Sequence, residues 1–266
     1  MDLSLLPLAM GPAALLVHVA WMLDAPRREP WRNVLRYVAA GAISAALAWL
    51  AEALASPLLA SADSRAIEWP LRFLVVFVGI GMVEEGCKYF CLTSAARGDH
   101  ELDEPFDWVV YAVAVALGFA AVENLRVLWL GASVGWVRAW TAVPAHALNG
   151  TLMGCRLAAA MRAGPGLGAR QRWLALVEPA LWHAAYDTVL FQIRATSGPV
   201  SGLYTLWFAV VVAQWWVAAH RVRFLWKDTQ GAPPILLPLG AVAHLRARRA
   251  HAEPRGNDGS DEIDKR

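Results

Sequence analysis

Long apolar stretches separated by short charged clusters dominate the chain. Seven of these stretches have about twenty residues or more, which lets an α-helix cross a bilayer core of roughly 30 Å. They lie at residues 3–23, 37–60, 69–93, 106–130, 134–160, 173–193 and 199–222. The pattern predicts an all-α fold: a polytopic membrane helix bundle with about seven transmembrane helices.

Small residues are frequent within these stretches, as in GAISAALAWLAEALA and AVAVALGFAA. They let helix backbones approach closely in lipid, where packing drives helix association, so we expect one compact bundle. Composition agrees, since 58% of the 266 residues are hydrophobic and only 17% are charged, whereas about a quarter is usual in soluble domains. The formal net charge of +2 gives no indication of nucleic-acid binding. The three cysteines all lie in apolar stretches and form no visible disulfide framework.

The first apolar stretch, in MDLSLLPLAMGPAALLVHVAWMLD, has no basic residue before it and is longer than the apolar part of a signal peptide. We therefore expect a retained first membrane helix. Orientation follows from the basic residues. With seven spans, 18 of the 24 lie in or at the edges of the first, third and fifth connections and the C-terminal tail. This asymmetry predicts the N-terminus outside and the C-terminus in the cytoplasm.

The last part of the chain changes character. The segment KDTQGAPPILLPLGAV is interrupted by prolines, and RGNDGSDEIDKR is polar and has no periodicity. We expect residues 1–225 to form a transmembrane domain and residues 226–266 to form a cytoplasmic tail that is largely disordered.

Ionisable residues lie inside four consecutive spans. Each costs about 2.5–3.5 kcal/mol on insertion scales, so each is a functional candidate. The residues are Glu84, Glu85, Lys88, Glu123, His146, His183 and Asp187. Glu84 and Glu85 lie four and three residues before Lys88, so the ammonium can neutralise either one and leave the other free. His183 and Asp187 are four apart, which suits either two metal ligands or one oriented imidazole.

These polar faces can converge on one cavity, as in a hydrolase. A carboxylate could take a proton from water, an imidazole could polarise a carbonyl or bind a metal, and Asn124 or Asn149 could donate to an oxyanion. The alternative is a proton- or cation-coupled membrane transporter that uses the same acids, but such a protein would be expected to have repeated halves, and the sequence contains none. Glu52 and Glu178 have no acid–base partner nearby, so we expect each to pair with an arginine.

In order along the chain, these residues form the motifs EExxK (84–88), FxxxE (119–123), a histidine followed by Gly150 four residues later, and HxxxD (183–187). This set, over roughly residues 69–193, resembles the PrsW family of intramembrane proteases within the superfamily of CAAX prenyl endopeptidases and bacteriocin-processing proteases. The resemblance implies an integral membrane endopeptidase of a bacterial plasma membrane. It also implies a membrane-associated protein substrate, an anti-sigma factor in the best-known case. The sequence does not indicate an oligomeric state.

The resemblance also implies roles for particular residues. The catalytic candidates are Glu84, Glu85, Glu123, His146, His183 and Asp187, and the supporting candidates are Lys88, Phe119, Asn124 and Asn149. In the wider superfamily the first motif ends in Arg and the second in His, where this chain has Lys88 and Glu123. With two histidines left, a glutamate-activated water is favoured over a metal-bound water on tightly held zinc. A divalent metal such as zinc could still be held by Glu123, His146, His183 and Asp187, although the chain has no HExxH motif.

Overall fold

The computed structural model describes residues 6–24, 28–127 and 132–230, and these form helices without any strand. The predicted all-α fold is therefore confirmed for this part of the chain. The helices are α1 (Leu6–Leu23), α2 (Trp31–Leu54), α3 (Ser56–Ala62), α4 (Trp69–Val76), the π-helical turn η2 (Phe77–Gly81), α5 (Met82–Ala95), α6 (Asp107–Val127), α7 (Ala132–Trp140), α8 (Ala142–Arg162), α9 (Pro165–Ala195) and α10 (Ser201–Gln230).

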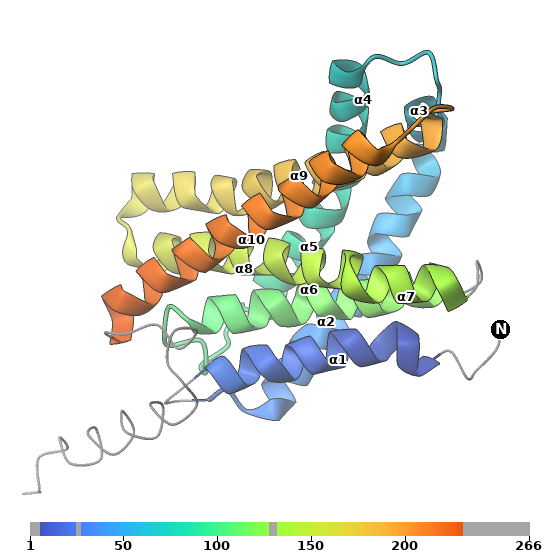
Figure 1. The fold of residues 1–266 in the computed structure, drawn as a ribbon. Coiled ribbons are helices and arrows are strands. Elements are labelled where there is room, and N and C mark those ends of the chain that lie inside the picture. The colour runs from blue at the N-terminus through green and yellow to red at the C-terminus, as the bar shows by residue number, and fades with distance from the viewer. Residues whose placement is uncertain (1–5, 25–27, 128–131, 231–266) are drawn as a thin grey trace, which may run out of the picture.

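Four of the described helices are long and apolar enough to cross a membrane: α1, α2, α6 over Asp107–Arg126, and α10 over Ser201–Trp226. This agrees with a polytopic membrane protein, while the number of seven spans and the orientation stay predictions. The ends of α1, α8 and α10 lie at one end of the bundle, on the left of Figure 1, together with the start of α6. The predicted tail lies, from residue 231 onward, outside the described residues.

Helix boundaries differ from the apolar stretches where charge or proline intervenes. The α2 helix begins at Trp31 rather than at residue 37, because Arg36 lies on the helix and pairs with Asp99. It ends at Leu54, just before the short α3 helix, which has a proline in its first turn. The predicted fifth span is divided into α7 and α8 at Thr141, whose backbone leaves helical geometry.

The α6 helix is the centre of the bundle and packs against α1, α2 and α8. Two glycines bring α2 and α6 very close together. A Cβ atom at Gly41 would lie 2.0 Å from the carbonyl oxygen of Val115, and one at Gly118 would lie 2.1 Å from that of Val38. The expected close approach of small-residue faces is therefore present at this crossing.

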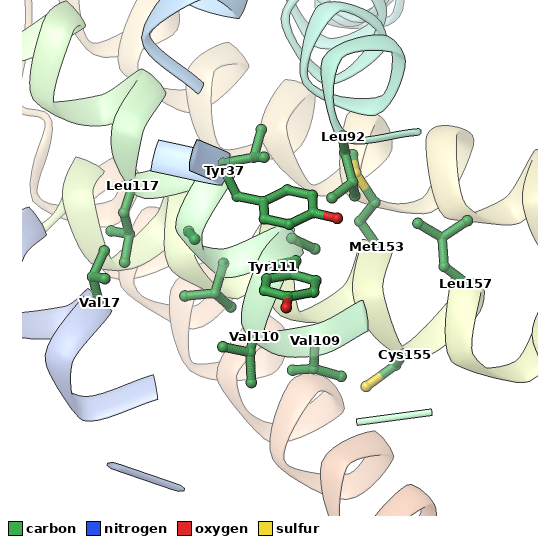
Figure 2. Close-up of a cluster of buried hydrophobic side chains, with 14 of the residues drawn as sticks. Val17, Tyr37, Leu92, Val109, Val110, Tyr111, Leu117, Met153, Cys155 and Leu157 are labelled. Atoms are coloured by element: carbon green, nitrogen blue, oxygen red, sulfur yellow. The ribbon is translucent and has the colours of Figure 1, made fainter. Parts of the chain in front are cut away.

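Aromatic and acidic side chains join α1, α2 and α6 at one end of this core. The rings of Tyr37 and Tyr111 stack with their centroids 3.9 Å apart (Figure 2). The Tyr111 hydroxyl donates to the buried Glu29 carboxylate, and the Glu29 backbone N–H donates to Asp24 Oδ2 at 2.9 Å. Burial raises the pKa of Asp24, which follows α1, to about 7. Asp107, on the first turn of α6, is also buried here.

Candidate active site

The EExxK motif lies on α5, directly after the π-helical turn η2. Such single turns interrupt α-helices most often at functional sites. At the end of this turn the backbone approaches α9 so closely that a Cβ atom at Gly81 would lie 2.6 Å from the carbonyl oxygen of Ala180. This contact carries the two glutamates of the motif toward His183, which lies three residues after Ala180 on the same helix.

Lys88 is the charged centre of the site and is 1% exposed. Its Nζ atom lies 2.8 Å from Glu85 Oε1, 3.4 Å from Glu84 Oε2 and 3.1 Å from His146 Nδ1. It also lies 3.9 Å from the centroid of the Phe119 ring, a cation–π geometry. The ammonium therefore offsets the burial of both carboxylates, with the shorter contact to Glu85.

Glu85 and Glu84 differ in how fully they are engaged. Besides Lys88, Glu85 Oε1 accepts a hydrogen bond from Asn149 Nδ2 at 3.2 Å and lies 2.9 Å from His183 Nδ1. Glu84 Oε2 makes longer contacts, at 3.4 Å to Lys88 and at 3.7 Å to His183 Nε2, and the Glu84 carboxylate also interacts with the Glu52 carboxylate. Glu85 is thus held by three groups from three helices, while Glu84 is held loosely.

The two imidazoles meet between α8 and α9, with ring centroids 5.4 Å apart and an interplanar angle of 79°. His146 Nε2 lies 2.9 Å from Glu123 Oε2, and His183 Nε2 lies 3.3 Å from Asp187 Oδ2. Each imidazole therefore has a carboxylate on one side and a member of the EExxK motif on the other.

The structure thus brings all six predicted catalytic residues together, and Lys88, Phe119 and Asn149 contact them. Asn124 is placed differently. Its amide nitrogen donates to the Ala9 carbonyl oxygen at 3.3 Å, and its Oδ1 atom accepts from Arg138 Nε at 2.9 Å. The expectation that Asn124 donates to an oxyanion does not fit these contacts, because its amide is committed to α1 and α7.

Two further residues belong to the site and escaped the sequence analysis. Arg138, near the start of the predicted span at residues 134–160, has its Nη2 atom 2.7 Å from Glu123 Oε2. Gln214, 1% exposed on α10, donates from Nε2 to Asn149 Oδ1 at 2.6 Å. The signal for Gln214 is a lone amide within the apolar run VVVAQWWVAA, and the signal for Arg138 is a basic residue within the predicted span at residues 134–160.

A small pocket of about 60 Å³ lies among these side chains, and a larger cavity of about 690 Å³ lies beside it. Both are lined by Glu84, Glu123, Arg138 and Asp187. The inner pocket has room for a few water molecules, and the outer cavity is within the usual size range of ligand sites. A route from the outer cavity therefore ends at the loosely held carboxylate.

The other intramembrane glutamates have arginine partners, as predicted. Glu178 accepts hydrogen bonds from Arg156 and Arg221, and Glu52 Oε2 lies 3.7 Å from Arg126 Nη1. All three cysteines are unpaired. The arginine-paired glutamates and the cysteines therefore add no candidate for the base of the site.

The donor atoms of the site fit a divalent metal. Oxygen and nitrogen atoms of Glu84, His146 and His183 all lie within 4.8 Å of one another, and all three residues are buried. One carboxylate and two imidazoles form a common protein ligand set for catalytic zinc. The contact between Glu85 and His183 Nδ1 also orients that imidazole in the way outer carboxylates do in such sites. This set differs from the predicted one, since Glu84 takes the place of Glu123 and Asp187.

Comparison with known proteins matches residues 29–215 to the family described as "PrsW family intramembrane metalloprotease". Two similar proteins are each named "Protease PrsW". The protein from Bacillus subtilis is 36% identical over 154 residues, which cover 57% of this chain and 66% of that protein. The protein from Geobacillus kaustophilus is 28% identical over 241 residues, covering 87% and 97%.

A third protein of the same name, from Oceanobacillus iheyensis, is 28% identical and covers 83% of this chain and 95% of its own length. No solved structure matches the chain. The matched region contains all four motifs, and these relatives are named proteases, so the comparisons give no support to the transporter alternative.

Proposed function

The chain belongs to the PrsW family of intramembrane metalloproteases, and we propose that it hydrolyses a peptide bond of a membrane protein inside the bilayer. One observation carries the proposal. Two glutamates, an aspartate and two histidines from four helices line a small buried pocket that adjoins a larger cavity. Such a set of bases, acids and hydrogen-bond partners matches the needs of water-driven hydrolysis.

Glu84 is the residue that faces the attacking water. It lines both the inner pocket and the outer cavity, and its contacts to Lys88 and His183 are long. Glu85 is fully buried, and its Oε1 atom already contacts three groups. A carboxylate can accept a proton from water only if water can reach it, which favours Glu84 over Glu85 as the base.

The two histidines act on the scissile bond. His183 is oriented by Glu85 at Nδ1 and by Asp187 at Nε2, and His146 is oriented by Lys88 and Glu123. Fixed partners keep each imidazole in one position, as catalysis requires. One histidine polarises the scissile carbonyl, and the other protonates the leaving amine.

A divalent metal would be held by Glu84, His146 and His183. When bound, it would supply Lewis-acid polarisation and lower the pKa of water. Glu84 would then be a ligand, and Glu123, which lines the same pocket, would be the carboxylate available to accept a proton. Replacement of Glu84 should remove activity whether Glu84 is the base or a metal ligand. The two mechanisms differ in whether the purified protein contains metal.

The substrate is a segment of a membrane protein that enters through the outer cavity. Its peptide bond must leave helical hydrogen bonding before it can be attacked, and such exposed backbone is tolerated at membrane depth only in a polar cavity. The outer cavity is polar in this way, because its wall carries Glu52, Glu123, Arg126 and Arg138. We place the protein in a bacterial plasma membrane, with a membrane-anchored regulator such as an anti-sigma factor as the substrate class.

The test compares Glu84→Gln with Glu101→Gln, a matched change at an exposed loop residue. Each variant and the wild type are expressed in bacterial membranes, and mass spectrometry identifies new termini of membrane proteins. We expect termini that appear with the wild type and with Glu101→Gln and that are lost with Glu84→Gln. The same termini at unchanged levels with Glu84→Gln would contradict the proposed centre.

Metal content decides between the two chemistries. Elemental analysis of the purified wild type should find a divalent metal that is lost from His146→Ala and His183→Ala. A wild-type protein that cleaves substrate without metal and in the presence of a chelator would reject the metal site and leave Glu84 as the base.

A further inference from the structure

A basic pocket lies between α8, α9 and α10, at the end of the bundle where α8 and α10 finish (Figure 1). Its volume is about 380 Å³, and three arginines line it: Arg156, Arg162 and Arg221. None of its lining residues lines the inner pocket or the outer cavity of the active site. The pocket is therefore a separate feature of the bundle.

The guanidinium groups are held in place by one carboxylate. Glu178 Oε2 accepts from Arg156 Nε at 2.6 Å, and Glu178 Oε1 accepts from Arg221 Nη2 at 2.7 Å. Arg156 Nη1 also donates to Gln171 Oε1 at 2.9 Å. Each guanidinium carries five N–H donors, so these contacts fix the orientation of the forks and leave further donors. Two guanidiniums, those of Arg156 and Arg221, share one carboxylate, which leaves an excess of positive charge.

The rest of the pocket is apolar and open toward the outside of the bundle. Trp216 and Phe224 on α10 line it and are 65% and 68% exposed. The ring of Trp216 stacks on His220, with centroids 5.7 Å apart. In a membrane-spanning helix these exposed aromatic surfaces meet lipid, so the pocket combines a basic end with a hydrocarbon-facing wall.

We propose that this pocket binds the phosphate group of an anionic phospholipid, with the acyl chains lying along Trp216 and Phe224. Guanidinium groups match phosphate oxygens in geometry and charge, and basic pockets between membrane helices bind lipid head groups. The excess positive charge favours a head group of net negative charge over a zwitterionic one. The apolar wall favours a lipid over phosphate in water, because a free phosphate would make no use of it.

The bound lipid would stabilise helices that support the active site. Asn149 and Gln214, which hydrogen bond across α8 and α10, lie seven residues before Arg156 and Arg221 respectively. Seven residues are two helical turns, or about 10 Å, on the same face of each helix. A phosphate held by Arg156 and Arg221 would therefore link α8 to α10 about two turns beyond the hydrogen bond between Asn149 and Gln214.

The experiment measures the melting temperature of the whole protein in detergent while lipid is added. The probes are dioleoyl phosphatidylglycerol, dioleoyl phosphatidylcholine and inorganic phosphate. The pocket variant is Arg162→Gln with Arg221→Gln. Its control is Arg170→Gln with Arg223→Gln, which removes the same charge from exposed residues at the same end of the bundle without touching the pocket lining.

We expect phosphatidylglycerol to raise the melting temperature of the wild type and of the control variant saturably, and the other two probes to leave it unchanged. In the pocket variant the lipid concentration at half effect should rise roughly tenfold or more. An equal effect of phosphatidylcholine, or an equal loss in both double variants, would overturn the proposal. The same shift with inorganic phosphate would identify a soluble ligand instead. If the pocket variant does not fold, Arg221→Gln alone replaces it, and an unchanged lipid response there would also overturn the proposal.

Discussion

Removal of the Lys88 charge should destabilise the protein more than removal of any exposed arginine. The ammonium is 1% exposed and lies 2.8 Å and 3.4 Å from two buried carboxylates. Taking one partner out of a buried ion pair costs about 3–5 kcal/mol, because the remaining charge stays desolvated. At roughly 2–4 °C per kcal/mol for a chain of this size, Lys88→Met should lower the melting temperature by roughly 6–20 °C.

A second variant separates the charge effect from the loss of packing. Lys88→Met combined with Glu85→Gln removes the ammonium together with its closest carboxylate, so it should recover a large part of the loss. Arg126→Met is the control, since Arg126 is 59% exposed and lies 3.7 Å from its partner Glu52. An exposed pair of this kind contributes at most about 1 kcal/mol.

The assay is thermal unfolding of the purified protein in detergent, followed by the fluorescence of its 14 tryptophans. The reasoning is refuted if Lys88→Met melts within about 2 °C of the wild type. It is also refuted if the double variant is less stable than Lys88→Met, because the two charges would then not be compensating each other.

Three further results are expected. Gly118→Ala should lower the melting temperature, because its Cβ would lie 2.1 Å from a backbone carbonyl oxygen of α2, whereas Gly164→Ala, with nothing within 4 Å, should not. Asp24→Asn should raise the melting temperature at pH 8 but not near pH 4. Burial raises the pKa of Asp24 from 3.8 to about 7, so wild-type stability is lost as the pH rises through that range. Arg138→Gln should lower the cleavage rate roughly 10- to 100-fold with little change in melting temperature, because Arg138 orients Glu123; an unchanged rate would argue against this role.

The fold class could be predicted because a bilayer imposes strong rules on sequence. Apolar length identifies α1, α2, α6 and α10 directly. Boundaries were less accurate where a charged residue lies on a helix, since Arg36 suggested a loop and instead pairs with Asp99 from within α2. The break at Thr141 has no apolar or charge signal, so α7 and α8 were merged into one span.

The membership of the site could also be predicted, because ionisable residues inside apolar spans are rare and costly. What could not be predicted was the pairing. Spacings of four and three residues allow Lys88 to contact Glu84 or Glu85, and only the packing of α8 and α9 against α5 adds Asn149 and His183 to Glu85. Arg138 lies in a predicted span, but its contacts with Glu123 and Asn124 on α6 depend on how α7 packs, which no local pattern indicates.

The sequence by itself determined that the chain lies in a membrane, that it is helical, and that the ionisable residues within its spans are candidates for chemistry, since hydrocarbon tolerates charge only where the protein compensates it. The tertiary structure decided which carboxylate is held by three groups and which faces the pocket. It also decided that Arg138 and Gln214 belong to the centre. These are distances between helices far apart in the chain, and they depend on close approaches such as Gly81 against Ala180, which a periodic pattern does not encode.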